Sequence, residues 1–199
     1  KKLMQLEQTE LLKKFSELVV EKNKIHNLTS AKSPEEFFKK HIGDCVAAYK
    51  TAEKTLYKSI VDCGSGAGLP SVVWSIMNPQ LEIHSVDSNQ KKIAFQKHIK
   101  RTLGLNNLFP TAARIQDFCP KKESTAIFKA FSSIKNGAQS LNQTAPFKNL
   151  IFLKKDDEKT KEEITEASAL LYDYKRHEYI SNKEKMLVVE LYDSKNSNN

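Results

Sequence analysis

The sequence is poor in the residues that build disulfide frameworks, metal centres and membrane spans. The chain of 199 residues has only three cysteines, at positions 45, 63 and 119. They are odd in number, widely spaced and without a C-x-x-C pair, which indicates neither a disulfide framework nor a zinc site. No stretch is apolar enough to cross a membrane, and the first residues lack a signal-peptide core. We therefore expect a cytoplasmic protein with no bound metal and no membrane association.

Charge is not lacking, and basic residues outnumber acidic ones, with 32 Lys and Arg against 24 Asp and Glu. The formal net charge is +8. The excess of positive charge is concentrated between residues 89 and 122, which contain eight Lys and Arg residues and a single acidic residue, Asp117. A local excess of this kind suits a polyanion, most simply nucleic acid. The alternative is a solvated helix face.

Hydrophobic periodicity predicts an α/β protein. The pattern indicates helices at 3–22, 34–49, from about 70, 90–103, 133–143 and 157–172, and strands at 59–63, 81–86, 108–111, 125–128, 149–153, 174–180 and 186–192. Alternation of this kind favours a Rossmann-like, mostly parallel sheet with helices on both faces and a C-terminal antiparallel hairpin. We expect a helical N-terminal cap (1–57), a main α/β domain (58–192) and a disordered tail (193–199).

Glycine is also scarce, with six in the chain, yet three of them alternate at Gly64, Gly66 and Gly68, directly after a short apolar run and Asp62. Glycine permits positive φ and a close approach of the backbone to a ligand. The dinucleotide fingerprint would need its third glycine at position 69, where Leu69 stands. The pattern D-x-G-x-G-x-G resembles instead the S-adenosylmethionine (SAM) loop of class I methyltransferases.

A second acidic residue supports the reading of a nucleoside cofactor. The apolar run 81–86 ends at Asp87, about twenty residues beyond the glycines, and an acid at this place in doubly wound folds accepts hydrogen bonds from ribose hydroxyls. We therefore predict that Asp87 holds the SAM ribose.

Several segments together resemble one family. Residues 27–37 (N-L-T-S-A-K-S-P-E-E-F) and 41–45 (H-I-G-D-C) are similar to its N-L-T-x-x-x-x-P-E-E-F and R-H-x-x-D-S motifs. Residues 64–70 (G-S-G-A-G-L-P), 87–95 and 103–107 are similar to its G-S-G-A-G-L-P-G, D-S-x-x-K-R-x-x-F and L-G-L-x-N motifs. The family is the bacterial 16S ribosomal RNA guanine-N7 methyltransferases (RsmG or GidB), and the resemblance is strong from about residue 20 to residue 155.

The resemblance implies that residues 58–192 are a SAM-dependent methyltransferase domain of the class I fold. It also implies SAM as cofactor and 16S rRNA of the small ribosomal subunit as partner. Ile115 and Gln116 would flank the adenine, and Lys129 stands where the family usually has Arg. His41 and Asp44 match its H-x-x-D and would position substrate rather than react with it. The predicted cofactor-binding residues are Asp62, Gly64, Gly66, Gly68, Leu69, Asp87, Ile115, Gln116 and Lys129.

The implied chemistry agrees with what else the sequence lacks. Guanine N7 carries an in-plane lone pair and no proton, so its methylation needs no general base. The sequence offers no Ser-His-Asp set, no paired acids and no evident nucleophilic Cys. It also lacks the Asn/Asp-Pro-Pro-Tyr/Phe signature after the fourth strand, which argues against methylation of an exocyclic amine.

Affinity for RNA should come from phosphate contacts. The predicted RNA-binding residues are Lys39, Lys40, Lys91, Lys92, Lys97, Arg101 and Arg114. Two alternatives stay open: a methyltransferase with another acceptor, and a non-catalytic module that binds SAM and RNA. The second is motivated by Lys129, by Gln116 in place of Glu, and by Lys154–Lys155 in place of L-K-G. Nothing suggests more than a monomer.

Overall fold

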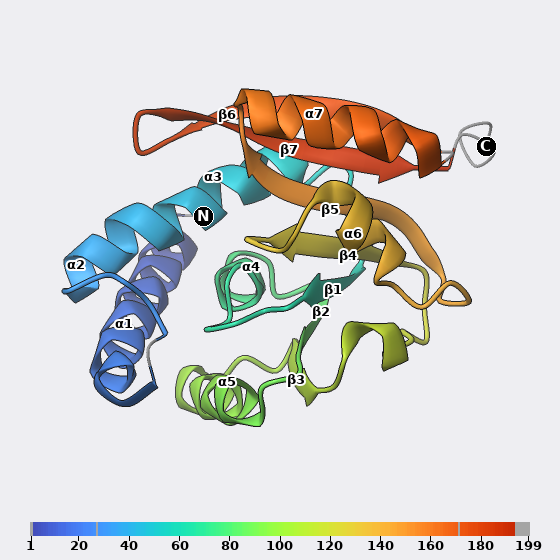
Figure 1. Cartoon of the computed structure of the whole chain (residues 1–199). Helices are drawn as coiled ribbons and strands as arrows, with labels where there is room; N and C mark the ends of the chain where they lie inside the picture. The colour runs from blue at the N-terminus through green and yellow to red at the C-terminus, as the bar shows by residue number, and fades with distance from the viewer. Residues whose placement is uncertain (1, 27, 171, 194–199) are drawn as a thin grey trace.

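One seven-stranded sheet runs through the molecule (Figure 1) in the order β3-β2-β1-β4-β5-β7-β6. The computed structural model describes residues 2–26, 28–170 and 172–193. The strands are β1 (Ser59–Cys63), β2 (Glu82–Asp87), β3 (Leu108–Ala112), β4 (Ser124–Lys129), β5 (Phe147–Lys155), β6 (Asp173–Ser181) and β7 (Glu184–Tyr192). β1 to β5 pair in parallel, and β7 pairs antiparallel with both β5 and β6.

Helices cover both faces of the sheet, as the sequence predicts. They are α1 (Lys2–His26), α2 (Pro34–Phe37), α3 (Gly43–Ala52), α4 (Ser71–Met77), α5 (Gln90–Leu103), α6 (Ile134–Gln139) and α7 (Glu158–Ala167). Buried side chains of α1 to α5 form one apolar core with one face of the sheet. α6 and α7 form the second core on the opposite face. Among the described residues, no helix is long and apolar enough to cross a membrane.

The predicted helix 34–49 is divided. Ser33 caps α2, since its hydroxyl accepts from the Glu36 N–H at 3.2 Å. A π-helical turn (Phe38–Ile42) then separates α2 from α3. Phe37 and Ile42 are both fully buried although they lie five positions apart. A π turn brings that spacing onto one face, whereas an α-helix places residues three and four apart on the same face.

The C-terminal segments also differ from the prediction in their ends. α6 stops at Gln139 rather than at 143, and α7 stops at Ala167 before a short 3₁₀ turn (Ser168–Leu170). The hairpin turn contains only Asn182 and Lys183, both with positive φ, as a two-residue turn between twisted strands requires. Residues 194–199, which hold nearly all of the predicted disordered tail, lie outside the described residues.

Candidate functional site

The glycine loop leaves β1 at the carboxyl end of the sheet. The N–H groups of Gly64 and Ser65 both donate to the carbonyl of Val86, at 2.8 and 3.1 Å, which ties the loop to β2. Gly68 has φ of 96°, and a Cβ there would lie 2.7 Å from Val72 Cγ2 of α4. Only glycine fits this turn without displacing α4.

Asp87 lies at the end of β2, directly opposite the glycine loop. One carboxylate oxygen accepts from the Gly66 N–H at 2.9 Å and the other from the Asn89 N–H at 2.8 Å. Each oxygen keeps a second lone pair, because a carboxylate has about four acceptor positions. The residue predicted to hold a ribose therefore also fixes the loop on which the ligand would lie.

Gln96 of α5 is a functional candidate that the sequence analysis missed. It is fully buried, and its Nε2 donates to Ser65 Oγ at 2.8 Å and to the Gly66 carbonyl at 2.9 Å. Its Oε1 is buried without a hydrogen-bond partner in the described part of the chain. The sequence did contain a signal for Gln96, because it is a polar residue on the same helix face as the apolar Ile93 and Ile99, both of which are buried.

A cavity of about 290 Å³ opens beside the loop at the carboxyl edge of β1 and β2. It brings together three predicted cofactor-binding residues besides Asp87, and Arg114, predicted to contact RNA. The lining residues are Gly64, Val86, Asp87, Ser88, Ala113, Arg114, Ile115, Gln116 and Phe131. Phe131 was not predicted; a Cβ on Gly64 would lie 3.1 Å from its ring. Asp62, Gly66, Gly68, Leu69 and Lys129 do not line this cavity.

Asp62 lies behind the loop and is almost completely buried. Its Oδ2 accepts from both the backbone N–H and the hydroxyl of Ser71. Its Oδ1 is buried without a partner among the described residues. Burial raises the pKa of Asp62 to about 7, although the Ser71 hydrogen bonds and Lys129 act in the opposite direction.

The raised pKa of Asp62 predicts a pH-dependent stability. Between pH 3.8, its ordinary pKa, and about pH 7, the Asp62 carboxyl binds a proton in the folded protein but not in the unfolded chain. The free energy that this proton contributes to stability is therefore lost as the pH rises through that range. We expect Asp62→Asn to remove a stability loss of roughly 3 kcal/mol between pH 5 and pH 8. Urea unfolding at pH 5 and pH 8 would measure it. Asp117→Asn, at an exposed carboxylate, is the control, and equal slopes in the two variants would contradict the prediction.

Lys129 and Asp44 form a buried ion pair at the end of β4. Lys129 Nζ lies 2.9 Å from Asp44 Oδ2, and the Tyr179 hydroxyl of β6 donates to Asp44 Oδ1 at 3.2 Å. This network joins α3, β4 and β6. His41 packs against Phe37 with ring centroids 5.2 Å apart. Burial, with the nearby charges of Lys129 and Lys40, lowers the pKa of His41, so its ring is neutral at pH 7.

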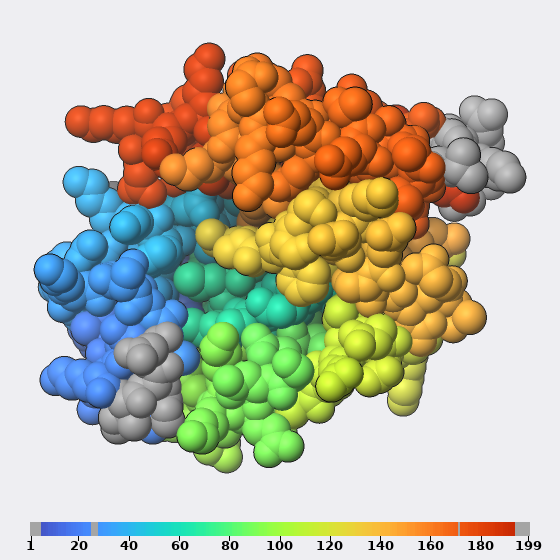
Figure 2. All heavy atoms as spheres, viewed as in Figure 1, coloured from blue at the N-terminus to red at the C-terminus, as the bar shows by residue number. Residues whose placement is uncertain are grey.

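The predicted RNA-binding residues lie on three separate elements. Lys39 and Lys40 are exposed on the π turn, and Arg114 lines the cavity beside the glycine loop. The other four lie on α5, which carries no acidic residue. In the space-filling view, α5 (green), the N-terminal helices (blue) and the segment after β4 (yellow) are all visible on one face of the molecule (Figure 2).

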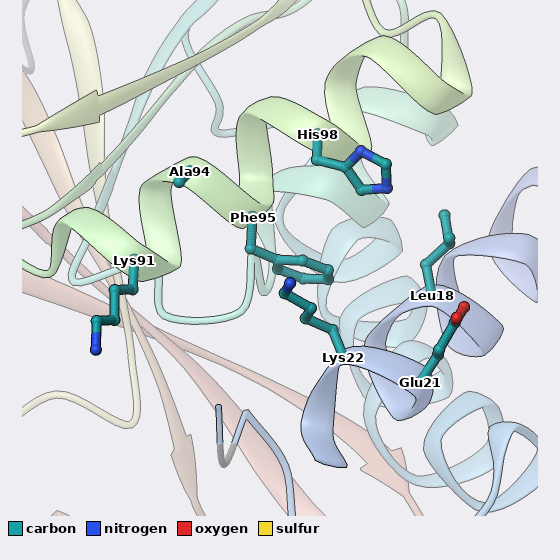
Figure 3. A pocket seen from close by; sticks show the side chains of 7 residues that line it. All are labelled: Leu18, Glu21, Lys22, Lys91, Ala94, Phe95 and His98. Atoms are coloured by element: carbon teal, nitrogen blue, oxygen red, sulfur yellow. The ribbon is translucent and has the colours of Figure 1, made fainter. Parts of the chain in front are cut away.

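A second cavity, of about 450 Å³, is lined by residues of α1 and α5. Phe95 of α5 and Lys22 of α1 point toward one another there, and His98 points toward Leu18 (Figure 3). Lys91 also lines it, three positions after Ser88 of the cavity beside the glycine loop. No group of three or more His, Cys, Asp or Glu side chains in the described ranges could hold a metal ion.

The strand order and the site at the carboxyl edge define a class I methyltransferase fold. Solved structures share it at low identity. TrmK from M. capricolum, solved with S-adenosyl-homocysteine, has a TM-score of 0.52 and 15% identity over 68% of this chain and 62% of that chain. A precorrin-6y C5,15-methyltransferase from Geobacter metallireducens GS-15 has a TM-score of 0.54 and 10% identity over 85% of this chain and 92% of that chain.

Within that class, the model of the GidB family, rRNA small subunit methyltransferase G, matches residues 8–189. The chain therefore belongs to this family. Several relatives are named ribosomal RNA small subunit methyltransferase G. That of Vibrio atlanticus is 32% identical over 75% of this chain and 70% of the relative. That of Methylobacillus flagellatus is 36% identical over 64% of this chain and 62% of the relative. That of Azoarcus sp. strain BH72 is 37% identical over 61% of this chain and 57% of the relative. The matched regions thus span between 57% and 70% of these relatives.

Proposed function

We propose that this chain transfers the methyl group of SAM to N7 of a guanine in 16S ribosomal RNA of the small subunit. The observation that carries the proposal is the cavity at the carboxyl edge of β1 and β2, where Gly64, Asp87, Ile115 and Gln116 meet. Membership of a family of rRNA small subunit methyltransferases supports the RNA substrate. A cytoplasmic monomer is part of the proposal. The exposed free Cys119 agrees with a reducing compartment, and size-exclusion chromatography tests the monomer.

The residues of the site fit SAM. The free lone pairs of the Asp87 carboxylate would accept from the ribose hydroxyls, and Ile115 and Gln116 would flank the adenine. Asp62, buried behind the glycine loop, would support the loop through its hydrogen bonds to Ser71. SAM supplies an activated methyl group on a sulfonium, so the difficult chemistry belongs to the cofactor.

The protein's own contribution is placement of the acceptor. Guanine N7 attacks with its lone pair, so no side chain has to remove a proton. Burial raises the pKa of Cys45 to about 12 and that of Cys63 well above its ordinary value, so neither thiol is a nucleophile at neutral pH. Holding two reactants in line can lower a barrier by roughly 7–11 kcal/mol. His41 and Asp44 would act as positioning groups.

The basic face of α5 is proposed to bind RNA phosphates. Lys91, Lys97 and Arg101 are exposed, and none of them forms an ion pair with a carboxylate in the part of the chain that the structure describes. The slope of log K against log salt falls by about 0.7–0.9 for each phosphate that the protein no longer neutralises. We expect replacement of all three by Gln to flatten the slope by about 2–3.

Filter binding to 16S rRNA fragments at several salt concentrations measures this slope. The matched control replaces Lys50, Lys54 and Lys58 by Gln. Lys50 lies in the last turn of α3, and Lys54 and Lys58 lie between α3 and β1; all three are exposed. An equal change of slope in both triple variants would show that α5 has no particular role.

Transfer of labelled methyl from SAM to small ribosomal subunits tests the function directly. The subunits come from a strain that lacks the corresponding gene, and nucleosides of the product are separated. Label in 7-methylguanosine of 16S rRNA supports the proposal. Label that survives ribonuclease treatment would indicate another acceptor. No label, with SAM binding intact by calorimetry, would indicate a binding module without turnover.

A further inference from the structure

The ion pair of Lys154 and Glu163 is largely buried, and each partner makes a hydrogen bond to the backbone of the loop between β4 and α6. The Lys154 ammonium, at the carboxyl end of β5, lies 2.8 Å from Glu163 Oε2 of α7 and donates to the Ser132 carbonyl at 3.0 Å. The same Glu163 oxygen accepts from the Ile134 N–H at 3.1 Å. The side chains of Lys154 and Glu163 are only 16% and 9% exposed. The pair thus fixes a carbonyl and an N–H on either side of Ser133.

The held loop has a conformation that needs support. Ala130 has φ of 53°, a region that L-residues other than Asn and Asp seldom adopt. Strained backbone of this kind persists where the surrounding structure determines it. The Ile134 N–H is also one of the first N–H groups of α6, which have no partner within the helix. Glu163 supplies that partner.

The same loop carries a wall of the cofactor cavity. Phe131 lines the cavity, and its ring is the nearest group to the position that a Cβ on Gly64 would occupy. Its ring also packs edge-on against Phe128, with centroids 5.2 Å apart. A shift of the loop would therefore move the Phe131 ring relative to the glycine loop. Lys154 and Glu163 do not line the cavity themselves.

We propose that Lys154 and Glu163 are positioning residues of the methyl-transfer site, which hold the loop 130–133 so that Phe131 forms the cavity wall before the cofactor arrives. This inference rests on the proposed function, because it takes the cavity to be the SAM site. Net stability does not account for the pair, since well-packed apolar replacements of a buried ion pair are often neutral or stabilising. The contacts instead connect α7 and β5 to the backbone of one loop.

The test uses double variants, because removal of one partner alone leaves an unpaired buried charge and can prevent folding. Lys154→Met with Glu163→Leu removes both loop contacts. Lys154→Met with Glu163→Gln keeps an acceptor for the Ile134 N–H and removes only the contact to Ser132. The matched control is Lys155→Met with Glu184→Gln, which removes the neighbouring exposed ion pair of 2.9 Å. Lys154→Arg keeps the charge and should retain wild-type behaviour.

Two readouts separate positioning from a structural role. Hydrogen exchange of the free proteins reports on the loop, and we expect faster exchange at the Ile134 amide in the Met/Leu variant. Calorimetry with SAM reports on the cavity, where we expect about tenfold weaker binding in that variant, a smaller loss in the Met/Gln variant and none in the control. Unchanged melting temperatures would show that the fold is intact.

Each result decides the inference. Faster loop exchange with weaker SAM binding supports it. Faster exchange with unchanged SAM binding, or unchanged exchange in the Met/Leu variant, overturns it while the proposed function stands. Absence of SAM binding in the wild-type protein would instead overturn the proposed function, and this inference with it. If the Met/Leu variant does not fold, the comparison of Met/Gln with the Lys155 control gives the same decision.

Discussion

Asp87→Ala is expected to weaken SAM binding by roughly 10²–10⁴-fold. A hydrogen bond to a charged group contributes ~1.5–3 kcal/mol, and the Asp87 carboxylate would make two to the ribose. The substitution also removes the acceptor of the Gly66 and Asn89 N–H groups, so the glycine loop loses its connection to the end of β2. Calorimetric titration with SAM measures the effect.

Two further variants sharpen this prediction. Asp87→Asn keeps the shape but not the charge, and its loss should be intermediate. Asp117→Ala removes an exposed carboxylate two positions after Ile115 and should bind SAM as the wild type does. If Asp87→Ala binds SAM normally, the ribose does not lie at the end of β2.

Lys129→Met is expected to be the most destabilising single substitution at the site. The methionine keeps the apolar stem but leaves the Asp44 carboxylate buried, and among the described residues the Tyr179 hydroxyl is then its remaining side-chain donor. Removing one partner of a buried ion pair costs ~3–5 kcal/mol, a large part of the stability of an ordinary domain. Equilibrium unfolding in urea at pH 7 measures the free energy of unfolding.

The control for Lys129→Met is an exposed ion pair of the same length. Lys13 and Glu10 lie 2.9 Å apart on α1 and are well exposed. Pairs of that kind contribute only ~0.2–1 kcal/mol. Lys13→Met should therefore change stability little. Equal losses in Lys13→Met and Lys129→Met would show that the Asp44 pair carries no special weight.

The fold was largely readable from the sequence because its signals are local. Buried parallel strands give short apolar runs, and the runs predicted all seven strands and the C-terminal antiparallel hairpin. The prediction was less accurate where tertiary contacts decide the conformation. The single helix predicted over 34–49 contains a π turn, because the core takes up both Phe37 and Ile42. The predicted ends of α6 and α7 were also misplaced.

The site shows the same division. Three alternating glycines and an acid at the end of the second strand are enough to indicate a cofactor loop, and the cavity contains Gly64, Asp87, Ile115 and Gln116. Their roles toward SAM remain predictions. The sequence did not indicate Phe131, and no pattern in it pairs Lys129 with Asp44.

The sequence by itself determined the succession of strands and helices along the chain, the glycine loop and the family, because these depend on residues that are close together in the sequence. Only the tertiary structure decided which distant side chains meet. Gln96 reaches Ser65 and Gly66 from α5, Tyr179 reaches Asp44 from β6, and Lys154 and Glu163 meet across the loop after β4. Such contacts carry no periodic signal, since they depend on how separate elements pack, and burial makes each of them consequential.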